Sequence, residues 1–225
     1  MEIPTVKIGL YKENQPEFTH QIKQALENIG VLQINGLNQL LVDCLYEYIQ
    51  KNITKFPPER KYLGKCFYQH NFYLLPSENL RESTEDKPVA ERDFVDSLMR
   101  TININVSEIV DTVYDHDDFS YLKIKYPEPI LIGYRKGPKM ISRDNRKKMM
   151  IREHSDNTRF TCAASASAPG LEGLFKGRWV PLQPEPGHIL LWGGKDLKLY
   201  SNGKVKPLFH RVLYPASERW ALLFV

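Results

Sequence analysis

The chain has 225 residues, of which 42% are hydrophobic and 26% are charged, and its formal net charge at pH 7 is +4. This composition is ordinary for a soluble globular protein, and the sequence holds no long apolar run of the kind that spans a membrane. Residues 1–4 lack the basic and apolar stretches of a secretory signal, so none is expected. The sequence has three widely spaced cysteines, Cys44, Cys66 and Cys162. Their number and spacing argue against a disulfide framework and against a structural zinc site. They predict a reducing, cytoplasmic compartment.

The first half of the chain predicts a region of amphipathic helices. Alternating apolar residues indicate short strands over residues 3–10 and 31–36. Apolar residues that recur every three or four positions predict helices over 18–29, 38–54 and 91–113. The expected inner faces of the first two helices consist of Phe18, Ile22, Ala25 and Leu26, and of Leu41, Cys44, Leu45 and Tyr48. Gly30 offers a stop to the first helix, and residues 59–90 are polar and weakly periodic.

After about residue 119 the pattern changes to many short strand-like runs separated by Gly, Pro, Asn and Lys. These runs cover residues 121–124, 129–134, 158–162, 171–175, 179–182, 188–192, 211–214 and 220–225. Many short strands with turn signals between them are typical of a sandwich or a barrel. We therefore expect a mainly β protein with an N-terminal helical annex, residues 1–118, and a β-core, residues 119–225.

Two histidines and one aspartate are candidate metal ligands. His154 and Asp156 point to the same side of the chain if that stretch is extended, and His210 opens a later strand-like run. Two imidazoles and one carboxylate on one side of an octahedral ion leave positions open for a co-substrate and dioxygen, which is the ligand pattern of non-haem Fe(II) oxygenases. Arg219 follows on the next strand and could bind a distal carboxylate with two parallel hydrogen bonds.

Each of these residues, taken alone, also has an ordinary structural interpretation. His154 could be a hydrogen-bonded histidine, His210 part of an edge-strand pair, and Arg219 part of an exposed turn. Tyr134 would by default be a half-buried strand aromatic. Their order and the motifs between them favour the functional interpretation. Those motifs are Pro169–Leu174, Gly177–Pro181, Pro186–Gly193, Tyr200–Gly203 and His210–Val212.

With these motifs the chain resembles the isopenicillin N synthase-like branch of the Fe(II)/2-oxoglutarate-dependent dioxygenases. The resemblance is specific from His154 to the C-terminus and weaker before it. In the weaker part, residues 30–36 occupy the place of the family motif Gly-Phe-Phe-x-Val-x-Asn-His-Gly. It implies a double-stranded β-helix, or jelly roll, preceded by amphipathic helices.

The same resemblance implies a ligand set. Fe(II) would be held by His154, Asp156 and His210. Arg219 would grip the far carboxylate of 2-oxoglutarate, and Tyr134 would help to position that acid. Two residues depart from the family pattern: Ala221 stands in place of the serine of Arg-x-Ser, and Ile132 in place of an asparagine two residues before the tyrosine.

The implied function is an oxidoreductase that uses dioxygen and 2-oxoglutarate to hydroxylate or desaturate a small organic substrate, with release of succinate and CO2. A basic stretch precedes the ligands, and it could attract an anionic group of the substrate. It contains Arg135, Lys136, Lys139, Arg143, Arg146, Lys147, Lys148 and Arg152. No aromatic residue interrupts it, which disfavours a nucleic-acid partner.

Two other interpretations stay open. The first is an oxidase like isopenicillin N synthase that uses no 2-oxoglutarate, which the missing serine favours. The second is a catalytically silent jelly-roll binding protein, in which the basic stretch would contact nucleic acid or a partner.

Overall fold

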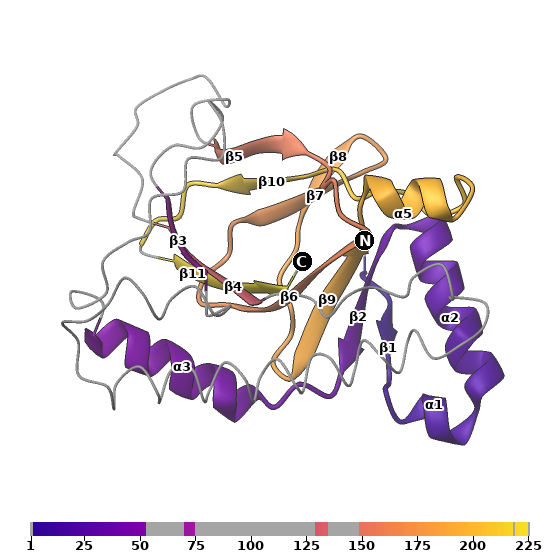
Figure 1. Ribbon diagram of the computed structural model, residues 1–225, viewed down its shortest axis with the longest axis horizontal. Coiled ribbons are helices and arrows are strands. Elements are labelled where there is room, and N and C mark those ends of the chain that lie inside the picture. The colour runs from indigo at the N-terminus through magenta and orange to yellow at the C-terminus, as the bar shows by residue number, and fades with distance from the viewer. Residues whose placement is uncertain (1, 53–69, 75–128, 135–148, 218, 225) are drawn as a thin grey trace.

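Two β-sheets face each other in the computed structural model, which describes residues 2–52, 70–74, 129–134, 149–217 and 219–224 (Figure 1). The major sheet has seven strands in the order β1-β2-β9-β6-β11-β4-β3, and the minor sheet has four in the order β5-β10-β7-β8. The strands of the major sheet are β1 (Thr5–Val6), β2 (Val31–Asn35), β9 (His188–Gly193), β6 (Phe160–Ala166), β11 (Arg219–Phe224), β4 (Pro129–Tyr134) and β3 (His70–Leu74). Those of the minor sheet are β5 (Met149–His154), β10 (His210–Leu213), β7 (Leu171–Phe175) and β8 (Arg178–Pro181). The predicted mainly β fold with a jelly-roll core is confirmed.

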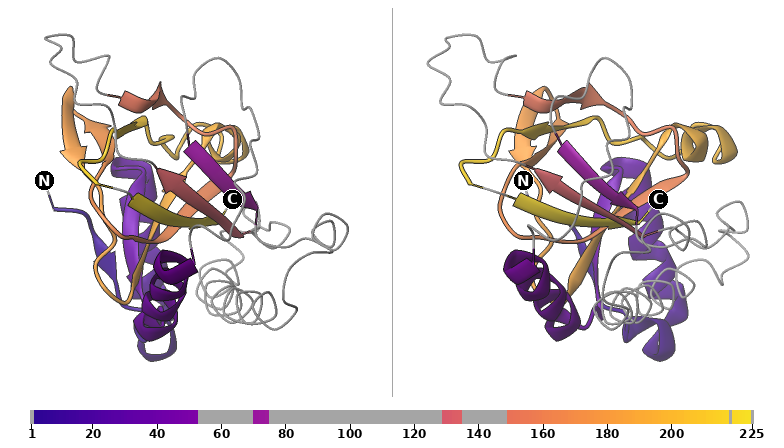
Figure 2. Two further views of the ribbon diagram at one scale, coloured as in Figure 1. Left: turned by 90° about the vertical axis from the view of Figure 1, so that its left-hand side faces the viewer. Right: turned by 60° about the vertical axis from the view of Figure 1, so that its left-hand side comes forward.

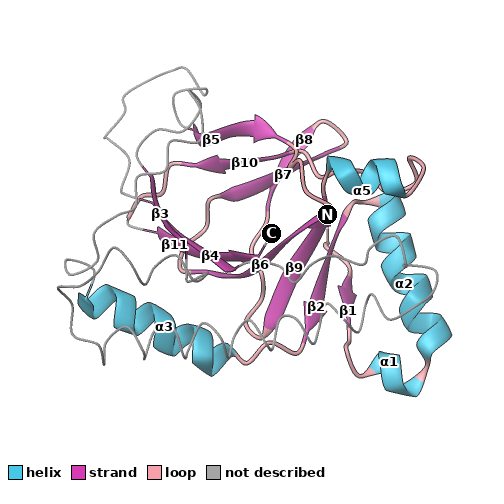
Figure 3. Cartoon of the chain, in the orientation of Figure 1, coloured by secondary structure: helices cyan, strands magenta, loops and turns pink. Residues whose placement is uncertain are grey.

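Helices lie outside this pair of sheets (Figure 3). They are α1 (Leu10–Glu13), α2 (Gln15–Asn28), α3 (Gln39–Asn52) and α5 (Lys195–Tyr200). The buried faces of α2 and α3 belong to one hydrophobic cluster with the outer face of the major sheet. In two further views the minor sheet lies on the opposite side of the major sheet from α3 (Figure 2).

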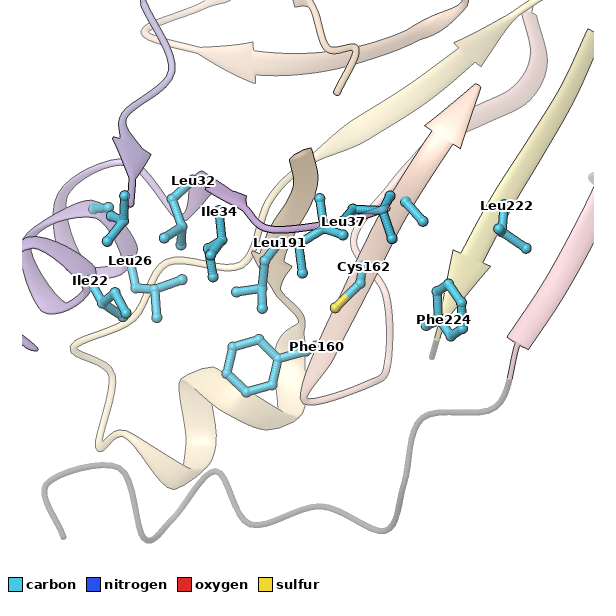
Figure 4. Close-up of a cluster of buried hydrophobic side chains, with 14 of the residues drawn as sticks. Ile22, Leu26, Leu32, Ile34, Leu37, Phe160, Cys162, Leu191, Leu222 and Phe224 are labelled. Carbon is cyan, nitrogen blue, oxygen red and sulfur yellow. The ribbon is translucent and has the colours of Figure 1, made fainter. Parts of the chain in front are cut away.

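Strands β2, β9, β6 and β11 of the major sheet are buried along most of their length, and they therefore read as nearly continuous apolar runs. In β9, Ile189 and Leu191 face the helices, whereas Leu190 and Trp192 face the minor sheet. Figure 4 shows Leu191 between side chains of α2, β2 and β6, among them Ile22 and Leu32. Because side chains alternate along the strand, every second residue of β9 points into the jelly roll, where the candidate site lies.

Local sequence explains the limits of α2. The Asn14 side chain accepts a hydrogen bond from the backbone N–H of Glu17 at 3.3 Å, which caps the first turn. The predicted face of Phe18, Ile22, Ala25 and Leu26 is buried. Gly30 ends the helix with a φ of +86°, where a side chain would collide with the backbone carbonyl of Lys206.

The strand predicted over residues 3–10 is much shorter than expected. It pairs with β2 only at Thr5 and Val6, and the chain then turns into α1. The turn arises because the Asn35 side chain accepts a hydrogen bond from the Ile8 backbone N–H at 2.6 Å, which ends the ladder. Alternation alone could not reveal this long-range contact.

The predicted inner stripe of α3 is wrong at Cys44, which is exposed. Leu45 is buried as predicted, and Val42 and Tyr46, which were not predicted, are buried with it. Leu41 and Tyr48 pack at the margin of the cluster. The helix carries two overlapping apolar stripes one residue apart, and the packing against the major sheet selects the second one.

Four described elements were not predicted: α1, β3, β5 and α5. Strands β1, β2 and β3 come from the N-terminal region and complete the major sheet, so that region is more than a helical annex. The expected helix over 91–113, the strand over 121–124 and Cys66 lie outside the described residues. The boundary at residue 118 stays a prediction. Within the described part of the chain, no helix is long and apolar enough to cross a membrane.

We expect Ile22→Ala to lower the free energy of unfolding by about 2–5 kcal/mol, because it leaves a cavity between α2 and the major sheet. Leu40→Ala is the matched control, since Leu40 is 74% exposed whereas Ile22 is fully buried. That variant should change stability by no more than about 0.5 kcal/mol. Denaturant unfolding followed by circular dichroism measures both, and equal losses would contradict this packing.

Candidate metal centre

The structure brings the three predicted metal ligands together on the minor sheet. His154 ends β5 and His210 begins β10, and the two residues are direct partners in the register of these strands. Their ring centroids are 4.4 Å apart. Asp156 follows two residues after His154, and one ligand atom from each of the three residues lies within 4.8 Å of the other two.

The two carboxylate oxygens of Asp156 have different partners. Oδ1 faces the histidines, at 3.3 Å from Nε2 of His154 and 3.7 Å from Nε2 of His210. Oδ2 accepts hydrogen bonds from the Thr161 hydroxyl at 2.6 Å and from the Trp192 indole N–H at 2.9 Å. The carboxylate therefore offers one oxygen to a metal and has the other bound to the protein.

Both histidines are oriented in the same way. Nδ1 of His154 lies 2.8 Å from the carbonyl oxygen of Arg152, and Nδ1 of His210 lies 3.3 Å from that of Leu208. A carbonyl oxygen only accepts, so Nδ1 carries the proton in each ring. Nε2 is therefore the nitrogen that each ring presents toward Asp156, and it is the atom available to a metal, as in metal-binding histidines with a fixed tautomer.

The charges of the site favour cation binding. Burial opposes ionisation of Asp156, yet its contacts with His154, His210, Thr161 and Trp192 together hold the pKa of the carboxyl far below its usual range. Burial, the largest effect, lowers the pKa of His210, which keeps that ring neutral. The hydrogen bond to Asp156 raises the pKa of His154. A metal ion would compete with that proton for Nε2.

One side of the cluster is open. The side chain of His154 is 37% exposed, whereas that of His210 is 6% exposed. A metal and its further ligands would thus be reached from the side of His154. Two imidazole nitrogens and one carboxylate oxygen, with space beyond them, fit Fe(II) with open coordination positions.

Arg219 lies inside the jelly roll at the start of β11. It is 3% exposed, and its Nε–H donates to the carbonyl oxygen of Ala168 at 2.7 Å. Gly170 packs against the arginine, since a Cβ there would lie 3.4 Å from both Cδ and Nε of Arg219. The guanidinium is therefore held in one place at the end of the barrel.

The chain is similar in sequence to known proteins. The sequence model of the 2OG-Fe(II) oxygenase superfamily matches residues 120–225. 1-Aminocyclopropane-1-carboxylate oxidase homolog 7 of Arabidopsis thaliana is 25% identical over 94% of this chain and 68% of its own length. Residues 120–225 belong to the 2OG-Fe(II) oxygenase superfamily.

Solved structures share the fold of this chain. The dioxygenase for auxin oxidation 1 of Arabidopsis thaliana, in complex with 2-oxoglutarate, aligns with a TM-score of 0.72 at 17% identity, over 99% of this chain and 91% of that one. A full-length Neurospora crassa protein in complex with α-ketoglutarate and thymine aligns with a TM-score of 0.70 at 14% identity, over 99% and 84%. The metal and co-substrate of the family, Fe(II) and 2-oxoglutarate, are compatible with the donor set of the triad.

The structure places the remaining predicted site residues in the following way. The backbone of Tyr134 lies directly opposite Arg219 in the ladder between β4 and β11. Its contact with the co-substrate stays a prediction. Ala221, the departure from the family serine, is buried in the inner hydrophobic cluster. The basic stretch 135–148 lies outside the described residues, and Arg152 is exposed on β5.

Thr161 and Trp192 were not predicted to orient a ligand. Trp192 lies 36 residues from Asp156 in the chain, and it reaches the site because β9 and β6 are neighbours in the major sheet. No local motif marks such a contact.

His154→Ala should weaken anaerobic Fe(II) binding by at least about 100-fold, because loss of an outer hydrogen-bond partner alone costs about 10- to 100-fold. His188→Ala is the matched control. The Nδ1 of His188 makes the same type of contact, with the carbonyl of Pro186 at 3.0 Å, but His188 begins β9 at the strand end away from Trp192. Undiminished Fe(II) binding by His154→Ala in a calorimetric titration would contradict the assignment.

Proposed function

We propose that this protein is an Fe(II)- and 2-oxoglutarate-dependent oxygenase that hydroxylates or desaturates a small organic substrate bearing an anionic group. Family membership gives the class of reaction and the co-substrate. The observation that carries the proposal is the triad itself, with Oδ1 of Asp156 and both Nε2 atoms converging on one point.

The residues of the site would have separate roles in this reaction. His154, Asp156 and His210 would hold Fe(II), which when bound supplies the activation of dioxygen that couples oxidation of 2-oxoglutarate to succinate and CO2 with oxidation of the substrate. Arg219 would orient the far carboxylate of the acid through paired, charged hydrogen bonds. Apolar residues of the inner cluster, among them Leu190 and Val212, exclude water around these groups.

The anionic character of the substrate rests on Lys195 at the open side of the triad. Its Nζ donates to the side-chain oxygen of Asn157 at 3.0 Å, and its charge is near enough to His154 to oppose protonation of that ring. Asn157 is neutral, so it directs the ammonium without cancelling its charge. An incoming carboxylate or phosphate is the natural complement.

An oxidase that uses no 2-oxoglutarate is the second candidate, and the observation that favours it is Ala221. The alanine removes one hydroxyl donor whose net value is about 0.5–1.5 kcal/mol, whereas a charged hydrogen bond contributes about 1.5–3 kcal/mol. The contribution expected from Arg219 to co-substrate binding is thus larger than the contribution lost with the serine hydroxyl. The third candidate, a silent jelly-roll binding protein, and the cytoplasmic location stay predictions of the sequence.

Arg219→Gln should raise the KM for 2-oxoglutarate by about 10- to 100-fold, because the charged hydrogen bonds to the distal carboxylate are lost. Succinate release measures the effect, and unchanged Fe(II) affinity shows that the variant is folded. Arg178→Gln, on an exposed residue of β8, should behave as wild type. If the Fe-loaded wild-type protein neither binds 2-oxoglutarate nor forms succinate, the oxygenase assignment is wrong.

Lys195→Ala should raise the KM for an anionic substrate by about 2- to 5-fold, as expected for one exposed charge pair. The probes are indole-3-acetate and its neutral amide, chosen because a related structure is named for auxin oxidation. Stimulation of 2-oxoglutarate turnover by the acid should exceed that by the amide. Lys198→Ala, on the same helix, is the control, and an equal response to acid and amide would contradict an anionic substrate.

A further inference from the structure

We propose that Trp192 is a positioning residue of the metal centre, and that it acts as part of a short segment, Trp192–Lys195, that holds the ligand residues in place. This inference rests on the proposed function, because it takes the triad to be a metal site. Nothing in the motifs of the sequence assigns Trp192 such a role.

The first observation is the hydrogen bond from the Trp192 indole to Asp156. Trp192 is 1% exposed, and the indole N–H is the only polar group of its side chain. A buried donor without an acceptor costs about 1–3 kcal/mol. Oδ2 of Asp156 supplies that acceptor at 2.9 Å. The same bond fixes the rotation of the carboxylate, so that Oδ1 stays directed at the histidines.

The second observation is the contact of the same ring with a histidine ligand. The Trp192 and His210 rings meet edge to face, with centroids 5.5 Å apart and planes at 63°. This geometry is favourable for aromatic pairs. One side chain therefore contacts both Asp156, through its N–H, and His210, through its ring.

The backbone that follows Trp192 contacts both ligand-bearing stretches. The carbonyl of Gly193 accepts from the N–H of Leu208 at 3.0 Å, and the carbonyl of Leu208 in turn accepts from Nδ1 of His210 at 3.3 Å. The N–H of Lys195 donates to the backbone carbonyl of Asp156 at 2.9 Å. The positions of His210 and Asp156 thus depend on the same four residues.

Gly194 shows how closely the segment Trp192–Lys195 approaches the ligand loop, residues 156–159. A Cβ at Gly194 would collide with the Thr158 carbonyl oxygen and would lie 3.0 Å from the Asp156 carbonyl oxygen. The N–H of Gly194 also donates to the carbonyl of Arg159 at 2.9 Å. Only glycine allows the backbone of the ligand loop to rest directly on the segment.

The segment is anchored on its other side by the N-terminal region. Trp192 pairs with Val31 of β2, and the N–H of Gly193 donates to the carbonyl of Gly30 at 3.2 Å. Strand β2 therefore supports the metal centre through β9 without contributing a ligand.

The test compares Trp192→Phe with Trp179→Phe. Phenylalanine keeps a ring beside His210 and removes the N–H. Trp179 packs with Arg211 at the face of the minor sheet, so its substitution is a control for the loss of an indole. Co(II) is the probe, because its visible spectrum reports coordination geometry and it is stable in air. Trp192→Phe should weaken Co(II) binding by about 10- to 100-fold and change the Co(II) spectrum, and Trp179→Phe should do neither.

A second measurement uses the wild-type protein, so the test does not depend on the folding of the variant. Zn(II) should shift the indole N–H resonance of Trp192 in the nuclear magnetic resonance spectrum and leave those of Trp179 and Trp220 in place. An unshifted Trp192 resonance on Zn(II) binding, or wild-type Co(II) affinity and spectrum in a folded Trp192→Phe, would overturn the positioning role. Failure of the wild-type protein to bind any of these metals would instead refute the proposed function.

Discussion

The site depends on the different partners of the two carboxylate oxygens of Asp156. Thr161 and Trp192 bind Oδ2, which leaves Oδ1 as the oxygen that faces the two imidazoles. Each imidazole is fixed in turn by a backbone carbonyl at Nδ1. Because every ligand has one atom bound to the protein, the remaining three atoms converge without a metal having to gather them. Preorganisation of this kind is what an open metal site requires.

The jelly roll supplies these partners from opposite layers. The minor sheet carries His154 and His210 as direct register partners, while the major sheet carries Thr161, Trp192 and Arg219. The two histidines and the side chains that orient Asp156 thus approach from facing strands, and Arg219 belongs to the same layer as the side chains that orient Asp156. The helices have an indirect role: α2 and α3 bury the outer face of the major sheet, which fixes the strands that carry these residues.

Sequence reasoning predicted the parts of the site that short motifs encode. His154, Asp156 and His210 were identified from spacing and resemblance, and the structure brings them together. Trp192 was not predicted because it meets Asp156 only through the pairing of β6 with β9. Thr161 lies only five residues after Asp156, but no motif marks its hydroxyl as a partner of the carboxylate. In the fold, the apolar face of α2 was correct because one stripe dominates its sequence, whereas α3 offered two stripes and the choice fell to tertiary packing. The strand expected over residues 3–10 failed for a similar reason: it ends at Val6, and beyond it the backbone N–H of Ile8 donates to the Asn35 side chain of β2.

The most direct test of this account is a crystal structure determined anaerobically with Fe(II) and 2-oxoglutarate. We predict ligation by Nε2 of His154, Nε2 of His210 and Oδ1 of Asp156, with Oδ2 still bonded to Thr161 and Trp192. The keto-acid end of 2-oxoglutarate should chelate the metal, and its far carboxylate should lie against Arg219. Iron bound through Oδ2 or through an Nδ1 atom, or a co-substrate that does not reach Arg219, would contradict the account.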